Sequence, residues 1–264
     1  ISRKYDLNEH AYPAELDTVS ALFEGISDAK TISFAGTDAF RDADDGPKGN
    51  TNGGNMSALL NALEVSWGDV GLLLSIPRQG LGNAAISGVA TDEQLERLGK
   101  GIWAARAITE PSFGSDSAAV STTAVLDGDE YVINGSKIYV TAGARASHIV
   151  VWATLDKTLG RAAIKSFVVP REYFGVTVER LAHKLGTQAP DTAANRFDNV
   201  RIPKENLLGS PEIQVEKGFA GVMETFDNTR PIVAAMAVGV ARAALEELRT
   251  ILTDAGVEIS YDKP

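Results

Sequence analysis

The central part of the chain consists of short strand-like segments, and this pattern sets the narrowest limits on its fold. Two dipeptides that tolerate the positive φ of tight hairpin turns, Asp127-Gly128 and Asn134-Gly135, join the first three segments. The pattern predicts an antiparallel sandwich or barrel. The segments are 124–126, 130–133, 137–141, 149–154, 165–170, 176–181 and 195–203.

Helical periodicity lies on both sides of these strands. Apolar residues recur at three- and four-residue spacing in 14–23 and 56–63, and Thr91 begins the pattern of a capping box. The period returns in 232–252, where Pro231 is predicted to occupy the first helical turn because a proline there needs no N–H partner. Helices, then strands, then helices predict separate domains rather than a βαβ sheet.

We therefore predict a multidomain α and β protein. Its parts are an N-terminal helical domain over 1–105, a middle β-domain over 106–210 and a C-terminal helical domain over 211–264. The chain begins at Ile1 rather than Met and stops at Pro264, soon after a helical stretch, so it is expected to be trimmed at both ends.

Charge and composition exclude several classes of function. The net charge is −10 and the pI about 4.9, which argues against nucleic acid or an anionic membrane surface as a partner. There is no cysteine, so disulfides and thiolate metal sites are excluded. The three histidines, His10, His148 and His183, are far apart in sequence, so no metal site is predicted. Without a signal peptide or a 20-residue apolar span, a cytoplasmic protein (or one of an organelle matrix) is expected.

Two segments carry clustered polar groups that are suited to a planar ligand. In the loop 108–116, Thr109, Ser115 and backbone N–H groups can converge on the polar edge of a flat ring. Tyr139 and Thr141 lie two residues apart, so on a regular strand they share one face, with an aromatic ring beside a hydroxyl. Taken alone, each favours a plainer interpretation: a turn whose side chains satisfy the backbone, and an ordinary cross-strand pair.

A third segment, 224–231, places Phe226, Asp227 and Arg230 on one helix face. An arginine and a carboxylate there can engage a phosphate or an amide-bearing tail. The alternative is a helix cap with an exposed ion pair that contributes about 0–1 kcal/mol.

Together these segments resemble the FAD-dependent acyl-CoA dehydrogenase family, and its medium-chain-like branch in particular. The resemblance covers about residues 50–250. Five motifs occur in the family's order: TEPSFGSD (109–116), DGDEYVINGSKIYVT (127–141), FVVP (167–170), FDNVRIPKENLLG (197–209) and FDNTRPIVAAMAVGVARAALE (226–246). The implied fold is an N-terminal helical domain, a middle β-domain and the start of a four-helix bundle, usually assembled as a tetramer.

The resemblance also implies roles for individual residues. Ile108, Thr109, Ser115, Tyr139 and Thr141 would bind FAD. Ser115, together with Phe226, Asp227 and Arg230, would line the channel for CoA. The implied reaction is α,β-dehydrogenation of an acyl-CoA thioester, with an electron-transfer flavoprotein as the acceptor.

Several positions depart from the family pattern. The catalytic base is a glutamate that most branches carry at a position beyond Pro264; other branches carry it just before the arginine that matches Arg230, where this chain has Thr229. No catalytic base is therefore expected within these 264 residues. Arg106 stands where the family usually has an aromatic residue beside the flavin.

Two further segments lack arginines that the family uses. The stretch 254–261 replaces an Arg-x-x-Phe-Gly segment that reaches a neighbouring subunit's FAD, and 186–192 lacks an arginine seen in many members. These departures leave two alternatives open, an FAD-poor or non-catalytic partner subunit of a hetero-oligomer, and a flavin oxidase on the same fold.

Overall fold

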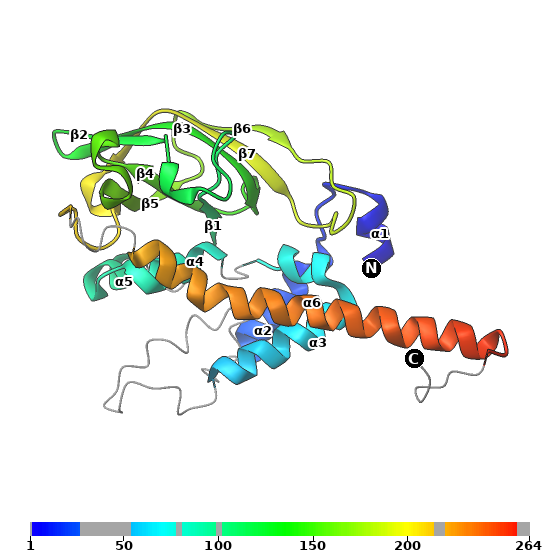
Figure 1. The fold of residues 1–264 in the computed structure, drawn as a ribbon. Coiled ribbons are helices and arrows are strands. Elements are labelled where there is room, and N and C mark those ends of the chain that lie inside the picture. The colour runs from blue at the N-terminus through cyan, green and yellow to red at the C-terminus, as the bar shows by residue number, and fades with distance from the viewer. Residues whose placement is uncertain (1, 27–53, 78–80, 99–101, 214–219, 258–264) are drawn as a thin grey trace.

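A computed structural model describes residues 2–26, 54–77, 81–98, 102–213 and 220–257, and within these ranges it gives the backbone alone for 22–26, 54–55 and 220–228. Helices lie at both ends of the chain and a single sheet lies between them (Figure 1). The α-helices are α1 (Ser2–Leu7), α2 (Glu15–Ile26), α3 (Gly54–Ser75), α4 (Leu81–Val89), α5 (Asp92–Leu98) and α6 (Ala220–Asp254). The strands are β1 (Ala104–Ala107), β2 (Thr123–Asp127), β3 (Glu130–Thr141), β4 (His148–Thr154), β5 (Ile164–Pro170), β6 (Val176–Leu181) and β7 (Thr192–Pro203). Short 3₁₀ turns are η2 (Ser117–Ala119), η3 (Lys157–Ala163) and η4 (Lys204–Asn206).

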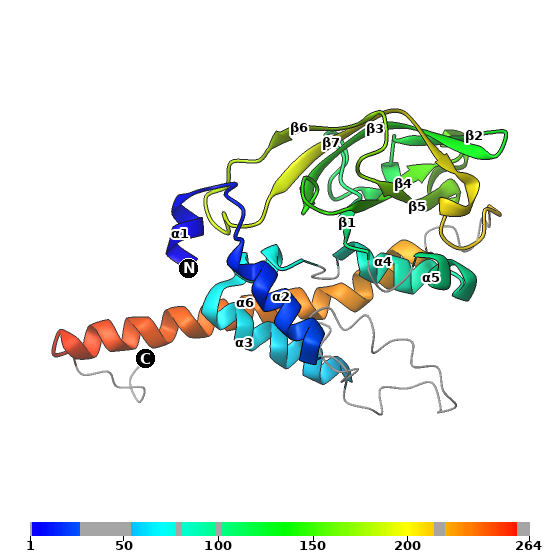
Figure 2. The same ribbon diagram turned by 180° about the vertical axis from the view of Figure 1, so that it is seen from behind.

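The seven strands form one curled sheet in the order β1-β4-β2-β3-β7-β6, with β5 paired to β4 (Figure 2). The β2–β3, β3–β7, β4–β5 and β6–β7 ladders are antiparallel, as predicted. The sheet is mixed rather than purely antiparallel, because β1 runs parallel to β4 and β2 meets β4 in parallel at one pair. The long chain between β1 and β4 allows this, since a parallel pair needs a crossover connection rather than a tight turn.

Only one of the two predicted hairpin turns exists. Gly128 has φ +65° and connects β2 to β3, as predicted. The second hairpin is wrong, because β3 continues through Gly135, which pairs with Phe197 next to a register shift in the β3–β7 ladder. Gly135 has φ +155°, and a Cβ there would lie 2.3 Å from Thr122 Oγ1. The glycine therefore serves a β-bulge and a close approach, not a turn.

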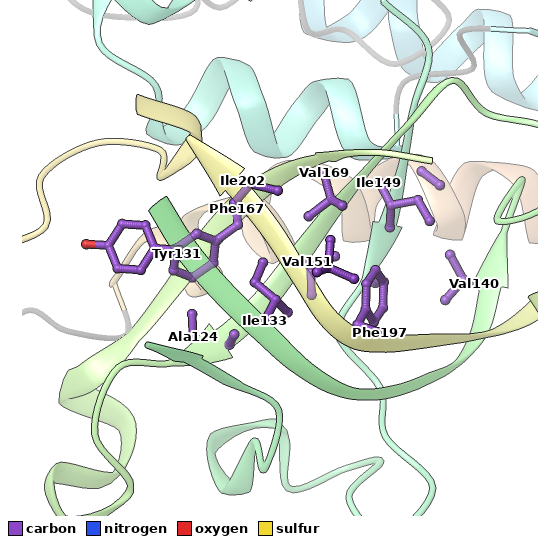
Figure 3. Close-up of a cluster of buried hydrophobic side chains, with 14 of the residues drawn as sticks. Ala124, Tyr131, Ile133, Val140, Ile149, Val151, Phe167, Val169, Phe197 and Ile202 are labelled. Atoms are coloured by element: carbon purple, nitrogen blue, oxygen red, sulfur yellow. The ribbon is translucent and has the colours of Figure 1, made fainter. Parts of the chain in front are cut away.

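The two faces of the sheet bury separate apolar clusters. One face encloses a core in which the rings of Tyr131 and Phe167 meet edge to face at 5.1 Å (Figure 3). The other face buries Trp152 and its neighbours against α4 and α5. Helix α4 approaches β1 closely because Gly82 has no side chain, and a Cβ there would lie 2.4 Å from the carbonyl oxygen of Ala104.

The long helix α6 packs along α3 and continues beyond the rest of the molecule (Figure 1). Gly239 is buried at the crossing with α3. The prediction that Pro231 lies in the first helical turn is wrong, because α6 begins at Ala220. A proline inside a helix removes one backbone hydrogen bond, so tertiary packing overrides the local preference here. Within the described residues, no helix combines the length and apolar character that a membrane crossing needs.

Candidate functional site

The buried carboxylate of Glu110 anchors the loop 108–116 to the sheet. Its Oε1 accepts hydrogen bonds from Thr122 N–H (2.9 Å), Thr122 Oγ1 (2.6 Å) and Lys137 Nζ (2.8 Å). Its Oε2 accepts from Ser121 N–H (2.8 Å) and from the Ser121 hydroxyl. The backbone of Glu110 also pairs with Phe113, which closes the turn at Pro111. The loop therefore has a rigid base.

Lys137 reaches this carboxylate from the middle of β3, and its side chain is fully buried. Its Nζ also donates to the carbonyl oxygen of Ile108 at 3.0 Å. Burial and ion pairing oppose each other at both groups. Burial lowers the pKa of Lys137 to about 8. At Glu110 burial raises the pKa, but the charge and hydrogen bonds of Lys137 outweigh it and lower the pKa to about 2. Both side chains are thus charged at neutral pH.

Because of the Glu110–Lys137 pair, we expect the free energy of unfolding to depend on pH. The pKa of Glu110 in the folded protein lies below its ordinary value of 4.5, so its stabilising contribution is complete above pH 4.5 and is lost as the pH falls toward about 2. We expect the difference in unfolding free energy between the wild type and Glu110→Gln to shrink as the pH falls from 4.5 toward about 2. Urea titrations on both sides of pH 4.5 measure this, and a difference that grows on acidification would contradict it.

The loop that bears Thr109 lies against β3, the strand that bears Thr141. The amide of Ile138 donates to the carbonyl of Thr109 at 2.9 Å, which holds the loop against the strand that carries Thr141. Thr109 and Thr141 are half-buried, and Ser115 at the other end of the loop is exposed. None of these three hydroxyls has a hydrogen-bond partner within the described residues. The interpretation that Thr109 and Ser115 only satisfy turn backbone therefore has no support.

Two other residues predicted to bind the cofactor, Tyr139 and Ile108, do not lie where regular strand alternation and an open loop would place them. Tyr139 is 65% exposed, lies in the left-handed region at φ +57°, and falls at a register shift between Lys137 and Val140. The strict alternation that put Tyr139 and Thr141 on one face is interrupted there, so that argument fails although both residues lie next to the loop. The side chain of Ile108 is buried in the apolar cluster beneath α4 and α5.

Helix α6 crosses the edge of the sheet near β1. Phe226 and Asp227 lie on the α6 backbone, but their side chains fall outside the described residues, and Arg230 is exposed. The neighbouring Thr229 is 7% exposed, and its Oγ1 accepts a hydrogen bond from Arg106 Nη1 at 3.3 Å. Burial lowers the pKa of the Arg106 guanidinium. Two of the positions that depart from the family pattern are therefore in direct contact.

Sequence reasoning missed the Glu110–Lys137 pair and the Arg106–Thr229 contact. An acid and a base 27 residues apart, or an arginine and a threonine 123 residues apart, carry no periodic signal that links them. Only the strand register and the path of α6 bring them together.

A separate cavity of about 310 Å³ lies among α1, α2 and α3. Its wall is mainly apolar, and none of the predicted site residues belongs to it. The lining residues are Ser2, Leu16, Val19, Val65, Gly68, Asp69, Leu72, Leu73 and Ile76.

Comparison with known proteins agrees with this architecture. Residues 105–200 match the family described as "Acyl-CoA dehydrogenase, middle domain". Over 213 residues the chain is 35% identical to a short-chain-specific acyl-CoA dehydrogenase of Clostridium acetobutylicum, which covers 78% of this chain and 55% of the relative. It is 34% identical over 206 residues to subunit CarC of the caffeyl-CoA reductase–Etf complex of Acetobacterium woodii, covering 75% and 53% of the two chains.

Among solved structures, butyryl-CoA dehydrogenase from Megasphaera elsdenii superposes with a TM-score of 0.78 at 28% identity, covering 99% of this chain and 65% of that one. The chain spans about half the length of the curated relatives that it matches. The shared segment includes the helices before the sheet, the curled sheet itself and the long helix after it. Residues 105–200 are an acyl-CoA dehydrogenase middle domain, and the chain belongs to the acyl-CoA dehydrogenase family.

Proposed function

We propose that this chain forms part of an FAD-dependent enzyme that introduces an α,β double bond into an acyl-CoA thioester. The observation that carries the proposal is that the loop bearing Thr109 is hydrogen-bonded to β3, which bears Thr141, and that both half-buried hydroxyls lack hydrogen-bond partners within the described residues. The buried Glu110–Lys137 pair keeps their loop in place. Preorganised donors of this kind suit the polar edge of an isoalloxazine ring.

The chemistry divides between cofactor and protein. FAD, when bound, accepts the hydride that leaves the substrate β-carbon while a base takes the α-proton. Thr141 and Thr109 would donate hydrogen bonds to the edge of the ring, and Ile108, Ser115 and Tyr139 would be its other contacts. Ser115, Phe226, Asp227 and Arg230 hold the CoA portion. Thr229 has no ionisable group, so we assign the base to a glutamate beyond Pro264.

The names of the relatives support a particular acyl chain length and a particular electron acceptor. Two of them are named for short-chain acyl-CoA and for butyryl-CoA, so we propose a short acyl group in place of the medium-chain-like assignment. CarC belongs to a complex with an Etf, which supports an electron-transfer flavoprotein as the acceptor. The second half of α6 exposes apolar side chains such as Leu245, Leu248 and Ile251, which supports packing against a further helix of the proposed bundle or tetramer. A role in fatty-acid β-oxidation in the cytoplasm or an organelle matrix fits this chemistry.

One structural observation favours a second candidate, the FAD-poor partner subunit. The Arg106–Thr229 contact places a cation where the family usually has an aromatic residue beside the flavin. Such a subunit would assemble with a catalytic one and leave the flavin sites of the oligomer non-equivalent. Four FAD per homotetramer would exclude this candidate.

The visible absorption spectrum of the full-length protein tests the proposal. We expect a flavin band that bleaches on anaerobic addition of butyryl-CoA. Rapid recovery of the bleached band in air, with consumption of oxygen, would instead identify an oxidase. Absence of a flavin band after reconstitution with FAD would overturn the dehydrogenase proposal and favour the partner subunit.

A single substitution tests the threonine pair. We expect Thr141→Val to raise the dissociation constant for FAD about tenfold, because a lost hydrogen bond between a buried donor and its acceptor is worth about 1–1.5 kcal/mol. Thr177→Val is the control, since this exposed threonine lies on β6. FAD titration by fluorescence quenching measures both. Equal affinities in the two variants would remove Thr141 from the site.

A further inference from the structure

We propose that Glu9, His10 and His183 form a binding site for one divalent transition-metal ion of the Zn²⁺ type. The three residues come from the segment after α1 and from the loop between β6 and β7, 174 positions apart. Their candidate ligand atoms all lie within 4.8 Å of one another. The wide sequence spacing of the histidines, which suggested no metal site, is therefore a poor guide to their spacing in the fold.

The distances suit a tetrahedral ion. Glu9 Oε2 lies 2.9 Å from His183 Nδ1 and 3.9 Å from His10 Nε2. Ligands at zinc–nitrogen and zinc–oxygen distances of about 2.0–2.2 Å in a tetrahedron stand about 3.4 Å apart. The two observed separations lie on either side of that value, so small side-chain rotations bring the three atoms to coordination distance. Two imidazoles and one carboxylate leave a fourth position for water, as in His₂Glu zinc sites.

Neighbouring groups hold Glu9 and the backbone of His10 in place, whereas the His183 side chain is 89% exposed. Glu9 Oε1 accepts a hydrogen bond from the amide of Lys184 at 2.7 Å, which leaves Oε2 to face both histidines. Such outer contacts orient a monodentate carboxylate. Arg145 donates to the carbonyl oxygens of His10 (3.5 Å) and Ala11 (3.1 Å) and so fixes the backbone that carries the second ligand.

His10 gives an independent indication of a ligand. Both of its ring nitrogens are buried, and neither has a hydrogen-bond partner within the described residues. Its backbone lies in the left-handed region at φ +69°, an unusual conformation for a residue with a side chain. Buried unpaired polar atoms and local strain commonly mark functional positions. A metal ion would satisfy the ring nitrogen that faces Glu9.

The cationic side chains near Glu9 are directed to other partners and not to the space between Glu9 and the two histidines. Arg145 is paired with Asp191 at 3.5 Å, and Lys184 directs its ammonium group to the Pro190 carbonyl and to Thr192. Glu9 therefore keeps its charge for the histidines, and the pKa of its carboxyl is lowered by the hydrogen bond with His183. A bound ion would link the segment that follows α1 to the loop between β6 and β7.

Calorimetric titration of the tag-free, chelator-treated protein with Zn²⁺ tests this site, with Co²⁺ absorption as a readout of coordination geometry. We expect one ion per chain and a rise in melting temperature on binding. His10→Ala, His183→Ala and Glu9→Gln should each weaken binding at least tenfold. His148→Ala is the matched control, because His148 lies on β4 beside Ser147 and should leave binding unchanged.

The outcomes are distinct. No saturable Zn²⁺ binding by the wild-type protein overturns the proposal and leaves Glu9–His183 as an ion pair only. Binding that survives in His10→Ala and His183→Ala, or that is lost equally in His148→Ala, also overturns it. If one histidine variant unfolds, the wild type and Glu9→Gln still decide the question. The site does not depend on the proposed dehydrogenase activity, so flavin binding can fail or succeed independently.

Discussion

Lys137→Met is expected to destabilise the protein by about 3–5 kcal/mol, because it leaves the carboxylate of Glu110 buried without its positive partner. The ammonium group of Lys137 has no access to solvent, and its two hydrogen bonds go to Glu110 and to the carbonyl of Ile108. Methionine fills a similar volume, so the effect reports lost charge rather than a cavity. The unfolding midpoint in urea, followed by circular dichroism, measures it.

Two further variants make that result interpretable. Lys204→Met removes an exposed ion pair with Asp129 and should leave the midpoint within error of the wild type. Adding Glu110→Gln to Lys137→Met removes the unpaired charge and keeps one acceptor oxygen, for either Ser121 or Thr122, so the double variant should be more stable than Lys137→Met alone. A Lys137→Met protein as stable as Lys204→Met would show that the pair does not fix the loop.

The order of elements was predictable because local patterns carry it. Periodicity locates α2, α3 and the strands β2 to β7 but not β1. Thr91 does cap α5, with Gln94 N–H to Thr91 Oγ1 at 3.3 Å and Thr91 N–H to Gln94 Oε1 at 3.0 Å. The hairpin turn predicted at Asn134-Gly135 was wrong because the same dipeptide occurs in turns and in β-bulges, and the pairing with the neighbouring strand determines which one forms. Pro231 misled for a similar reason, since packing of α6 on α3 outweighs a local preference.

The candidate site was predictable only in part. The loop and β3 were found by their polar residues, and the structure places them in contact through the Thr109 carbonyl. The strand-face argument for Tyr139 and Thr141 could not foresee a left-handed residue inside β3. The buried partners of the loop, and the meeting of His10 with His183, arise from chain topology, which no local pattern encodes. The domain boundaries at 105 and 210 and the individual ligand contacts remain predictions.

Gly239→Ala should be the second most damaging of these substitutions, with a loss of roughly 2–3 kcal/mol or more. Gly239 is buried where α6 crosses α3, and a Cβ there would lie 2.2 Å from the carbonyl oxygen of Leu63 and 3.1 Å from the Cβ of Ser66. The nearer atom belongs to the backbone, so no side-chain rotation relieves the clash. The two helices must move apart, which weakens the packing of Met236 against the apolar cluster of α2 and α3.

Gly68→Ala is the matched control, since it makes the same change at an exposed position of α3, beside the non-helical Asp69, where a Cβ meets nothing within 4 Å. It should be neutral or slightly stabilising, because alanine loses less conformational entropy on folding than glycine does. Movement of α6 would also displace Thr229 from Arg106, so we expect Gly239→Ala, and not Gly68→Ala, to disturb that contact. Equal unfolding midpoints for the two variants would mean that α6 does not cross α3 through this glycine, and the position of Thr229 beside β1 would then lose its structural basis.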